Sequence, residues 1–184
     1  KQVGFEVTYK ENLEYREFGR TLGDFERDLS NSDISLIYYA GHGIEVDNIN
    51  YLVPVDAELR SASDVKFETI ILNDAVSASL KTGKLSMVLI DACRDNPFSK
   101  SMNGGSRSIG RGLSIVDAQS EKIDQIISFA AESGEIAEDG IGSNSPYATA
   151  LIELLGQPNL EVGKLFRRLG DEVERMTKGK QIPV

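Results

Sequence analysis

"ISLIYYAGHG" at 34–43 and "LSMVLIDACRD" at 85–95 decide the fold of this chain. Each begins as a continuous apolar run and then changes abruptly into polar residues. A run that is apolar without alternation is typical of a strand buried on both faces, as in a parallel sheet. The polar end of the first run holds His42, the only histidine, and that of the second holds Cys93, the only cysteine. The two runs therefore predict two buried strands that each end in a chemically reactive residue.

The patterns around these two runs predict an α/β fold. Besides the two runs, we expect strands at 3–7, 49–57 and 125–131, with Pro54 indicating an edge for the second of these. We expect helices at 12–29, 68–82, 146–155 and 159–178, with Asn12 and Ser145 as N-caps and with Gly83 and Gly156 ending the second and third. This order predicts a single three-layer domain over residues 1–184, with a mostly parallel central sheet and helices on both faces. The Ser-, Gly- and Arg-rich stretch 99–112 predicts a mobile loop, at about 98–122, within that domain.

Composition excludes several classes of function. The 184 residues carry 20 Lys and Arg against 29 Asp and Glu, a formal net charge of −9, which argues against a nucleic-acid partner. A single cysteine excludes an internal disulfide, and one histidine plus one cysteine exclude a Cys/His zinc cluster. No apolar run reaches the roughly 18 residues of a membrane helix, so no membrane partner is expected. The cytoplasm is weakly favoured, but a start at Lys1 resembles a fragment or a processed form and leaves a secreted or periplasmic location open.

The two reactive residues lie where α/β proteins bind ligands. Ligands of open α/β sheets bind outside the carboxyl ends of the strands, and His42 and Cys93 both follow such ends. A thiol beside an imidazole gains thiolate character, and the imidazole can later protonate a leaving amine. Gly41 and Gly43 predict a tight turn around the histidine that lets substrate backbone approach closely. Taken singly, Cys93 could instead be a small core residue, but the equivalent positions of the pair favour an active site.

The motifs resemble the caspase-like cysteine peptidases, closest to the metacaspase, paracaspase and bacterial branch. "YYAGHG" is followed 51 residues later (93 − 42 = 51) by "DACRD", the spacing of the family's histidine and cysteine. "NYLVPVDA", "IISFAAESGEIAEDG" and "NSPYATALIELL" are similar to the same branch. The resemblance covers about 3–182 and implies a cysteine endopeptidase with His42 as general base and acid and Cys93 as nucleophile. It also implies an oxyanion hole formed by the backbone N–H groups of Gly43 and Cys93.

The resemblance also predicts that some elements of the family's fold are missing here. We expect the first strand and helix, which would precede Val3, to be missing from this sequence, and likewise the closing strand that would follow Pro183. Family members occur as monomers and as dimers, so the oligomeric state stays open between monomer and homodimer.

Some metacaspases need calcium, yet no residues can be assigned to it, because the aspartates at 47, 56, 64 and 74 lack the calcium-loop spacing. We therefore expect no cofactor and no metal site.

Asp91 points to the substrate preference. Residues i and i+2 of a strand face the same side, so Asp91 should share a face with Cys93. A carboxylate there would attract Arg or Lys at P1, the substrate residue before the scissile bond, and repel an acidic one. Metacaspases and paracaspases, which cut after basic residues, carry aspartate at this place, whereas the caspase pattern has glutamine. The alternative is a buried carboxylate that pairs with Arg94 or accepts backbone N–H bonds.

Three weaker features complete the sequence-based expectations. Glu135, or Glu132, is a second candidate for the P1 pocket, although either could equally be a solvated loop charge. Self-cleavage is expected at Arg107 or Arg111, because both lie in the predicted loop. "GSRSIGRG" lacks the Lys-Ser/Thr of a phosphate loop, so nucleotide binding is rejected.

The partner expected from the resemblance and from Asp91 is a protein or peptide with a basic P1 residue. The alternative to a peptidase is a catalytically silent caspase-like scaffold or docking module, against which the intact His/Cys pair argues.

Overall fold

The computed structural model describes residues 3–93, 109–110, 123–132 and 144–184. Within these ranges one sheet has the spatial order β3-β2-β1-β4-β6, with β5 paired to β1. The strands are β1 (Ile34–Val46), β2 (Ile49–Val53), β3 (Ile70–Ile71), β4 (Leu85–Cys93), β5 (Ile109–Gly110) and β6 (Asp124–Phe129). The helices are α1 (Tyr15–Asp28), α2 (Ala62–Glu68), α3 (Leu72–Ser79), α4 (Pro146–Leu155) and α5 (Val162–Thr177), and a short 3-10 turn, Leu29–Asn31, follows α1.

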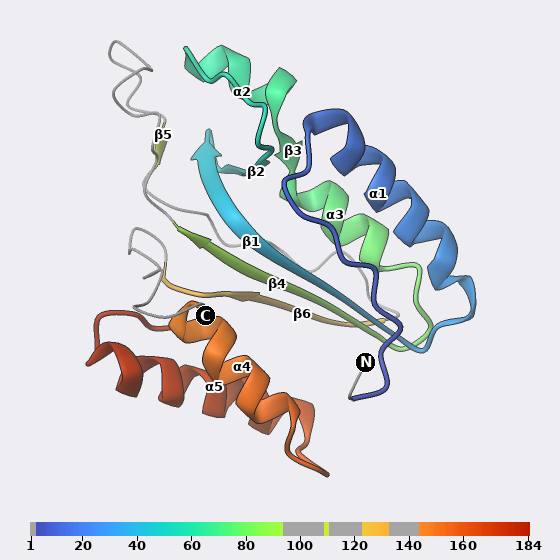
Figure 1. Cartoon of the computed structure of the whole chain (residues 1–184), viewed down its shortest axis with the longest axis vertical. Coiled ribbons are helices and arrows are strands. Elements are labelled where there is room, and N and C mark those ends of the chain that lie inside the picture. The colour runs from blue at the N-terminus through green and yellow to red at the C-terminus, as the bar shows by residue number, and fades with distance from the viewer. Residues whose placement is uncertain (1–2, 94–108, 111–122, 133–143) are drawn as a thin grey trace.

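The long strands of the sheet are parallel and carry helices on both faces. β4 pairs in parallel with β1 on one side and with β6 on the other, while the shorter strands β2, β3 and β5 join antiparallel. Helices α1 and α3 cover one face, and α4 and α5 cover the other (Figure 1). The predicted three-layer α/β fold, parallel through its long strands, is confirmed.

The central strand β4 is buried on both faces, as its apolar run predicts. Val88 and Ile90 pack in the cluster formed with α1 and α3, whereas Met87 and Leu89 pack in the cluster formed with α4 and α5. All four are no more than 7% exposed. Because strand residues alternate between faces, this assigns the even positions of β4 to the α1/α3 side and the odd positions to the α4/α5 side.

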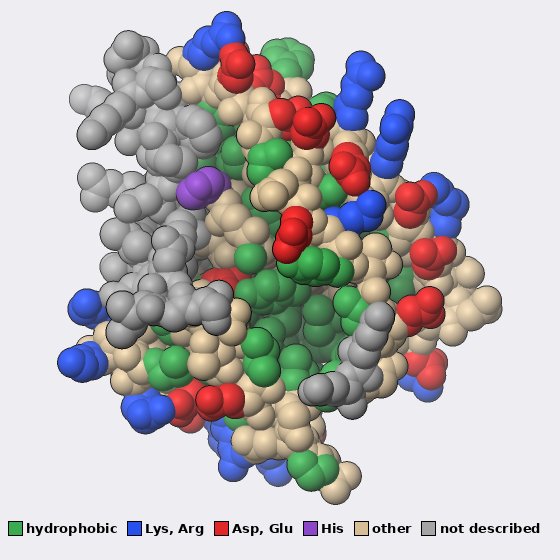
Figure 2. All heavy atoms as spheres, viewed as in Figure 1, with side chains coloured by type: hydrophobic (Ala, Val, Ile, Leu, Met, Phe, Trp, Pro, Cys, Tyr) green, Lys and Arg blue, Asp and Glu red, His purple; other side chains and the backbone are tan. Residues whose placement is uncertain are grey.

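The same expectation is wrong for part of β1. Ile34 is 44% exposed and Tyr38 is 39% exposed. Over residues 34–41 this strand pairs with β4 along one edge, and no strand among the described residues pairs along its other edge. Figure 2 shows a broad apolar area in the middle of the view, where Figure 1 places β1. A strand with a neighbour on only one side leaves its apolar side chains partly open to solvent.

Several predicted element boundaries need correction. Residues 3–7 are not a strand, because no described strand pairs with them, and Val7 is exposed. The first helix begins at Tyr15, since Asn12 has a φ of 52°, outside the extended conformation of an N-cap. The predicted helix at 68–82 is interrupted, because Ile70 and Ile71 leave the helical path to pair with β2. α3 then begins at Leu72 and ends at Ser79.

The hairpin after His42 also differs from the prediction. β1 does not turn at Gly41–Gly43 but continues to Val46, and the chain turns at Asp47 and Asn48, whose φ angles are 52° and 63°. Positive φ at both central residues is the requirement of a two-residue hairpin whose twist matches its strands. β2 ends at Val53, before Pro54, and it is not an edge strand because β3 pairs with its outer side. His42 therefore lies inside β1. It is opposite Cys93 of β4 on one side of the strand and opposite Val53 of β2 on the other.

The C-terminal half follows its sequence signals closely. α4 spans the predicted 146–155, with the Ser145 hydroxyl accepting a hydrogen bond from the backbone N–H of Ala148 at 2.9 Å. α5 lies inside the predicted 159–178. The backbone N–H and carbonyl groups of Val184 form hydrogen bonds with those of Phe129, so Val184 lies beside β6.

The predicted loop at 98–122 lies outside the described residues, except for Ile109 and Gly110, which form β5. The described helices include none with the length and apolar character needed to cross a bilayer.

Candidate active site

The parallel ladder between β1 and β4 places His42 directly opposite Cys93. The ladder runs from Ile34 opposite Leu85 to His42 opposite Cys93, which is its last rung. Neighbouring strands lie about 4.8 Å apart. Two segments separated by 51 positions in the chain (93 − 42 = 51) thus meet at the carboxyl end of the parallel strands. His42 is exposed, and Figure 2 shows the histidine side chain at the surface.

The ladder also defines the face of the sheet on which the candidate site lies. Tyr38 is opposite Leu89, and Ala40 is opposite Asp91. Leu89 packs toward α4 and α5, so the even positions of β1 and the odd positions of β4 belong to that face. Positions 42 and 93 therefore share a face with Asp91, as the sequence predicts.

Asp91 is buried and held by two hydroxyl groups. Only 8% of the residue is exposed. Its Oδ2 accepts a hydrogen bond of 2.5 Å from the Tyr38 hydroxyl of β1 and another of 2.5 Å from Ser145, the N-cap of α4. In the described part of the chain Asp91 makes no ion pair. Side-chain hydroxyls therefore take the place of the backbone N–H donors considered from sequence, and Arg94 lies outside the described residues.

Sequence reasoning did not connect Tyr38 with this site, although strand alternation offered the signal. Tyr38 lies four positions before His42 and so belongs to the same face of the strand. Although 39% of Tyr38 is exposed, partial burial raises the pKa of its phenol first, and the hydrogen bond to the Asp91 carboxylate raises it further. The phenol therefore keeps its proton at neutral pH and stays a hydrogen-bond donor.

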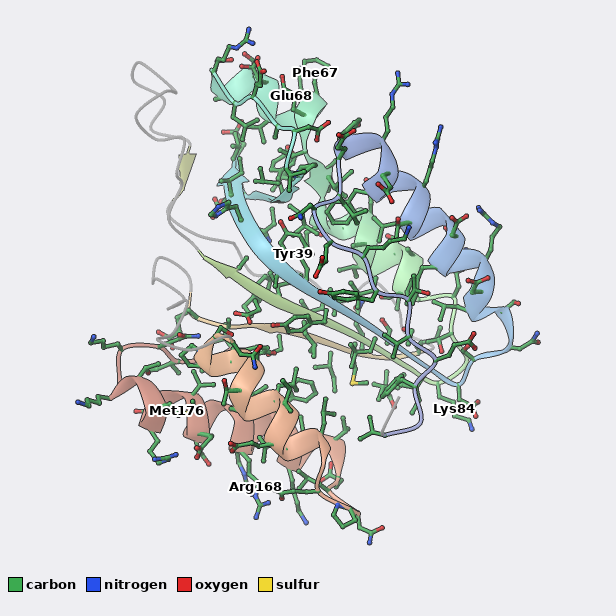
Figure 3. All side chains as sticks on the ribbon, in the orientation of Figure 1. Tyr39, Phe67, Glu68, Lys84, Arg168 and Met176 are labelled. Carbon is green, nitrogen blue, oxygen red and sulfur yellow. The ribbon has the colours of Figure 1, made fainter. Side chains whose placement is uncertain are left out.

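The opposite face of β1 supports the backbone of His42. Tyr39 lies on the side of α1 and α3 (Figure 3), where its ring stacks on Phe18 with centroids 5.9 Å apart. The Tyr39 hydroxyl donates to the carbonyl oxygen of His42 at 2.8 Å and to that of Val53 at 3.2 Å. A Cβ at Gly41 would lie 2.6 Å from this hydroxyl oxygen and 2.8 Å from ring atom Cζ. Gly41 is thus needed for the close approach of the Tyr39 ring.

We expect Gly41→Ala to destabilise the protein by about 1–3 kcal/mol, the usual cost of overpacking a filled site. The added methyl group would displace the Tyr39 ring and so weaken its hydrogen bond to the His42 carbonyl. Urea unfolding measures the change in the free energy of unfolding. Gly19→Ala is the matched control, because Gly19 lies in α1 with no heavy atom within 4 Å of its Cβ position. That variant should be neutral or stabilised by up to about 1 kcal/mol. Equal stability of Gly41→Ala and wild type would contradict this account of Gly41.

The remaining predicted site residues are placed only in part. Gly43 is buried and pairs with Leu52, and Glu132 is exposed after β6. Glu135, Arg107 and Arg111 lie outside the described residues. No group of three or more potential metal ligands occurs among the described residues. The expectation of no cofactor stays a prediction, and the oligomeric state stays open between monomer and homodimer.

Comparison with known proteins identifies the family. A model of the caspase domain matches residues 1–184, so the chain belongs to the caspase-domain family of cysteine peptidases. A search of curated proteins found no match.

Solved structures show the same fold. Caspase-1 from Spodoptera frugiperda matches with a TM-score of 0.65 at 18% identity, covering 100% of this chain and 71% of that one. The structure of pro-sf-caspase-1 matches with a TM-score of 0.59 at 18% identity, covering 99% of this chain and 72% of that one. A Geobacter sulfurreducens protein matches with a TM-score of 0.58 at 14% identity, covering 90% and 71%.

Proposed function

We propose that this protein is an active cysteine endopeptidase that cleaves after Arg or Lys. The observation that carries the proposal is the last rung of the β1–β4 ladder, which sets His42 opposite Cys93, with Asp91 two positions earlier on the same face. A nucleophile and a base at one end of a sheet, next to a buried carboxylate, provide a peptidase with its two reacting groups and one specificity element.

The proposed reaction follows the chemistry of thiol peptidases. His42 takes the proton of the Cys93 thiol, and the sulfur bonds to the scissile carbonyl carbon, whose oxygen becomes negative. The backbone N–H groups of Gly43 and Cys93 are proposed to stabilise that oxygen. The carbon–nitrogen bond then breaks, and the amine leaves with the proton held by His42. Water adds to the resulting thioester while His42 accepts its proton. The carbon–sulfur bond then breaks, the acid leaves, and His42 returns the proton to the Cys93 sulfur.

The charge of Asp91 supports a basic P1 residue. Its two described partners are neutral hydroxyls, so they cancel none of the negative charge of the carboxylate. A guanidinium or ammonium group can therefore supply the opposite charge, whereas an aspartate at P1 would place two carboxylates together. This distinguishes the protein from caspases that cut after aspartate, whose pattern has glutamine at the position of Asp91.

A panel of fluorogenic peptides that differ only at P1 tests the proposal. We expect turnover with Arg and Lys and none with Asp. Preference for Asp would overturn the proposed P1 specificity but not the proposal that the protein is a peptidase. No turnover with any peptide, together with no labelling of Cys93 by a thiol-reactive peptide probe, would favour the alternative of a silent scaffold.

We also expect the wild-type protein to cut itself after Arg107 or Arg111. Arg107 is flanked by serines and Arg111 by glycines, and a tethered substrate is present at high effective concentration. Intact-mass analysis of wild type beside Cys93→Ala should show fragments ending at these residues in wild type alone. A replacement of both arginines by glutamine should stay intact. An uncut but fully active wild type would exclude self-cleavage as an activation step.

A further inference from the structure

The carboxylate of Asp91 belongs to a hydrogen-bond chain that joins three elements of the fold. The backbone N–H of Ala148 donates to the Ser145 hydroxyl oxygen at 2.9 Å, and Ser145 in turn donates to Asp91 Oδ2. The Tyr38 hydroxyl donates to the same oxygen from β1. The chain therefore links β1, β4 and the first turn of α4 through one oxygen atom.

This arrangement constrains one oxygen of the carboxylate. Two donors from different elements converge on Oδ2, which restricts rotation of the carboxylate about χ2. Among the described residues no donor reaches the other oxygen, Oδ1. Hydroxyl groups orient an anion without neutralising it, unlike an Arg or Lys partner. The partial positive charge at the N-terminus of the ten-residue helix α4 further favours a negative group beside Ser145.

We propose that Tyr38 and Ser145 are positioning residues for substrate specificity, which hold Asp91 so that Oδ1 receives the basic P1 side chain. The proposal rests on the proposed function, because it requires Asp91 to bind a cationic P1 group. It adds two residues whose proposed action is on Asp91 and not on the reacting atoms. Ser145 thereby combines two roles, since the hydroxyl that caps α4 is also the donor that orients the carboxylate.

The properties of Tyr38 fit this role. Burial and the hydrogen bond to Asp91 both raise the pKa of its phenol, so it donates throughout the pH range in which a peptidase is assayed. Tyr147 provides a contrast on the same side of the sheet, because its hydroxyl donates to Ser128 at 2.9 Å and not to Asp91. The two tyrosines therefore separate the hydrogen bond to Asp91 from the general presence of a phenol on this face of the sheet.

The test compares peptides that carry either arginine or its uncharged isostere citrulline at P1. Wild type is expected to prefer arginine. Tyr38→Phe and Ser145→Ala should each lower the ratio of kcat/KM for arginine to that for citrulline by about tenfold, the lower end of the loss of a hydrogen bond to a charged group. The loss should appear mainly as a higher KM for the arginine peptide. Ser145→Thr, which keeps a hydroxyl donor and a cap, should restore most of the ratio.

Controls separate specificity from stability. Tyr147→Phe removes a buried hydroxyl that does not bond to Asp91 and should leave the ratio unchanged. Ser145→Ala also removes an N-cap, which costs about 1 kcal/mol of stability. Urea unfolding and active-site titration with a thiol probe therefore accompany each variant, and ratios are taken per titrated site.

The outcomes distinguish this inference from the function on which it rests. If wild type shows no preference for arginine over citrulline, the proposed basic P1 specificity fails. If wild type prefers arginine but Tyr38→Phe and Ser145→Ala keep its ratio, the specificity stands and the positioning role is overturned. An equal loss for both peptides also overturns that role, because it indicates a general structural effect.

Discussion

Cys93→Ala is expected to abolish peptidase activity, and His42→Ala to lower kcat/KM by about 10⁴- to 10⁶-fold. The two residues are opposite each other on the last rung of the β1–β4 ladder. A nucleophile and its base act as a unit, so the loss of either removes most of the rate that both provide. Without the imidazole the thiol has no partner to take its proton, and the leaving amine has no proton donor. Initial rates on an arginine peptide, with purified protein, give the size of both effects.

The dyad experiment needs evidence that the variants fold. His42 is exposed, so its replacement by alanine should change the free energy of unfolding by no more than about 0.5 kcal/mol. A thiol-reactive peptide probe supplies a readout that does not depend on turnover. It should label wild type rapidly, label His42→Ala slowly and leave Cys93→Ala unlabelled. Turnover that persists in Cys93→Ala would show that Cys93 is not the nucleophile.

Asp91→Asn is expected to lower kcat/KM for arginine peptides by about 10- to 150-fold. This range corresponds to the roughly 1.5–3 kcal/mol of a hydrogen bond to a charged group. Asparagine has nearly the same volume as aspartate and can still accept hydrogen bonds from Tyr38 and Ser145, so the variant removes mainly the negative charge. Turnover of citrulline peptides should change little, because an uncharged P1 group gains less from that charge.

Asp124→Asn is the matched control for Asp91→Asn. It makes the same change in net charge at an exposed carboxylate, but Asp124 begins β6 opposite Leu85, at the other end of the parallel strands. Its kinetics should equal those of wild type for both peptides. If Asp91→Asn weakens the arginine and citrulline reactions equally, Asp91 supports the fold and does not select the substrate.

Much of the architecture could be predicted from local patterns. The apolar run of β4 predicted a strand buried on both faces, and Ser145 followed by Pro146 predicted the start of α4. Such signals succeed because strand burial and helix capping depend on residues adjacent in sequence. A comparable signal was missed before α2, where the backbone N–H of Ser61 donates to the Asp64 side chain at 2.8 Å in a capping box.

The incorrect predictions share a different physical origin. Residues 3–7 have the composition of a strand but no described partner strand, and strand structure requires a neighbour for its backbone hydrogen bonds. Ile34 and Tyr38 belong to an apolar run, yet their exposure depends on an edge of β1 that no described strand covers. The glycines around His42 resemble turn residues, but the actual turn lies at Asp47 and Asn48.

The sequence by itself determined which residues are proposed to carry the chemistry. His42, Cys93 and Asp91 are recognisable from their positions after apolar runs and from their spacing, because strand alternation assigns a residue to a face whatever lies beside it. Only the tertiary structure decided what each of them meets. Tyr38 and Ser145 lie 53 and 54 positions from Asp91, and Tyr39 supports His42 from the opposite face of β1. Such contacts follow from strand register and from the packing of α4 on the sheet, because periodicity along a chain encodes the face of a residue but not its neighbour across the fold.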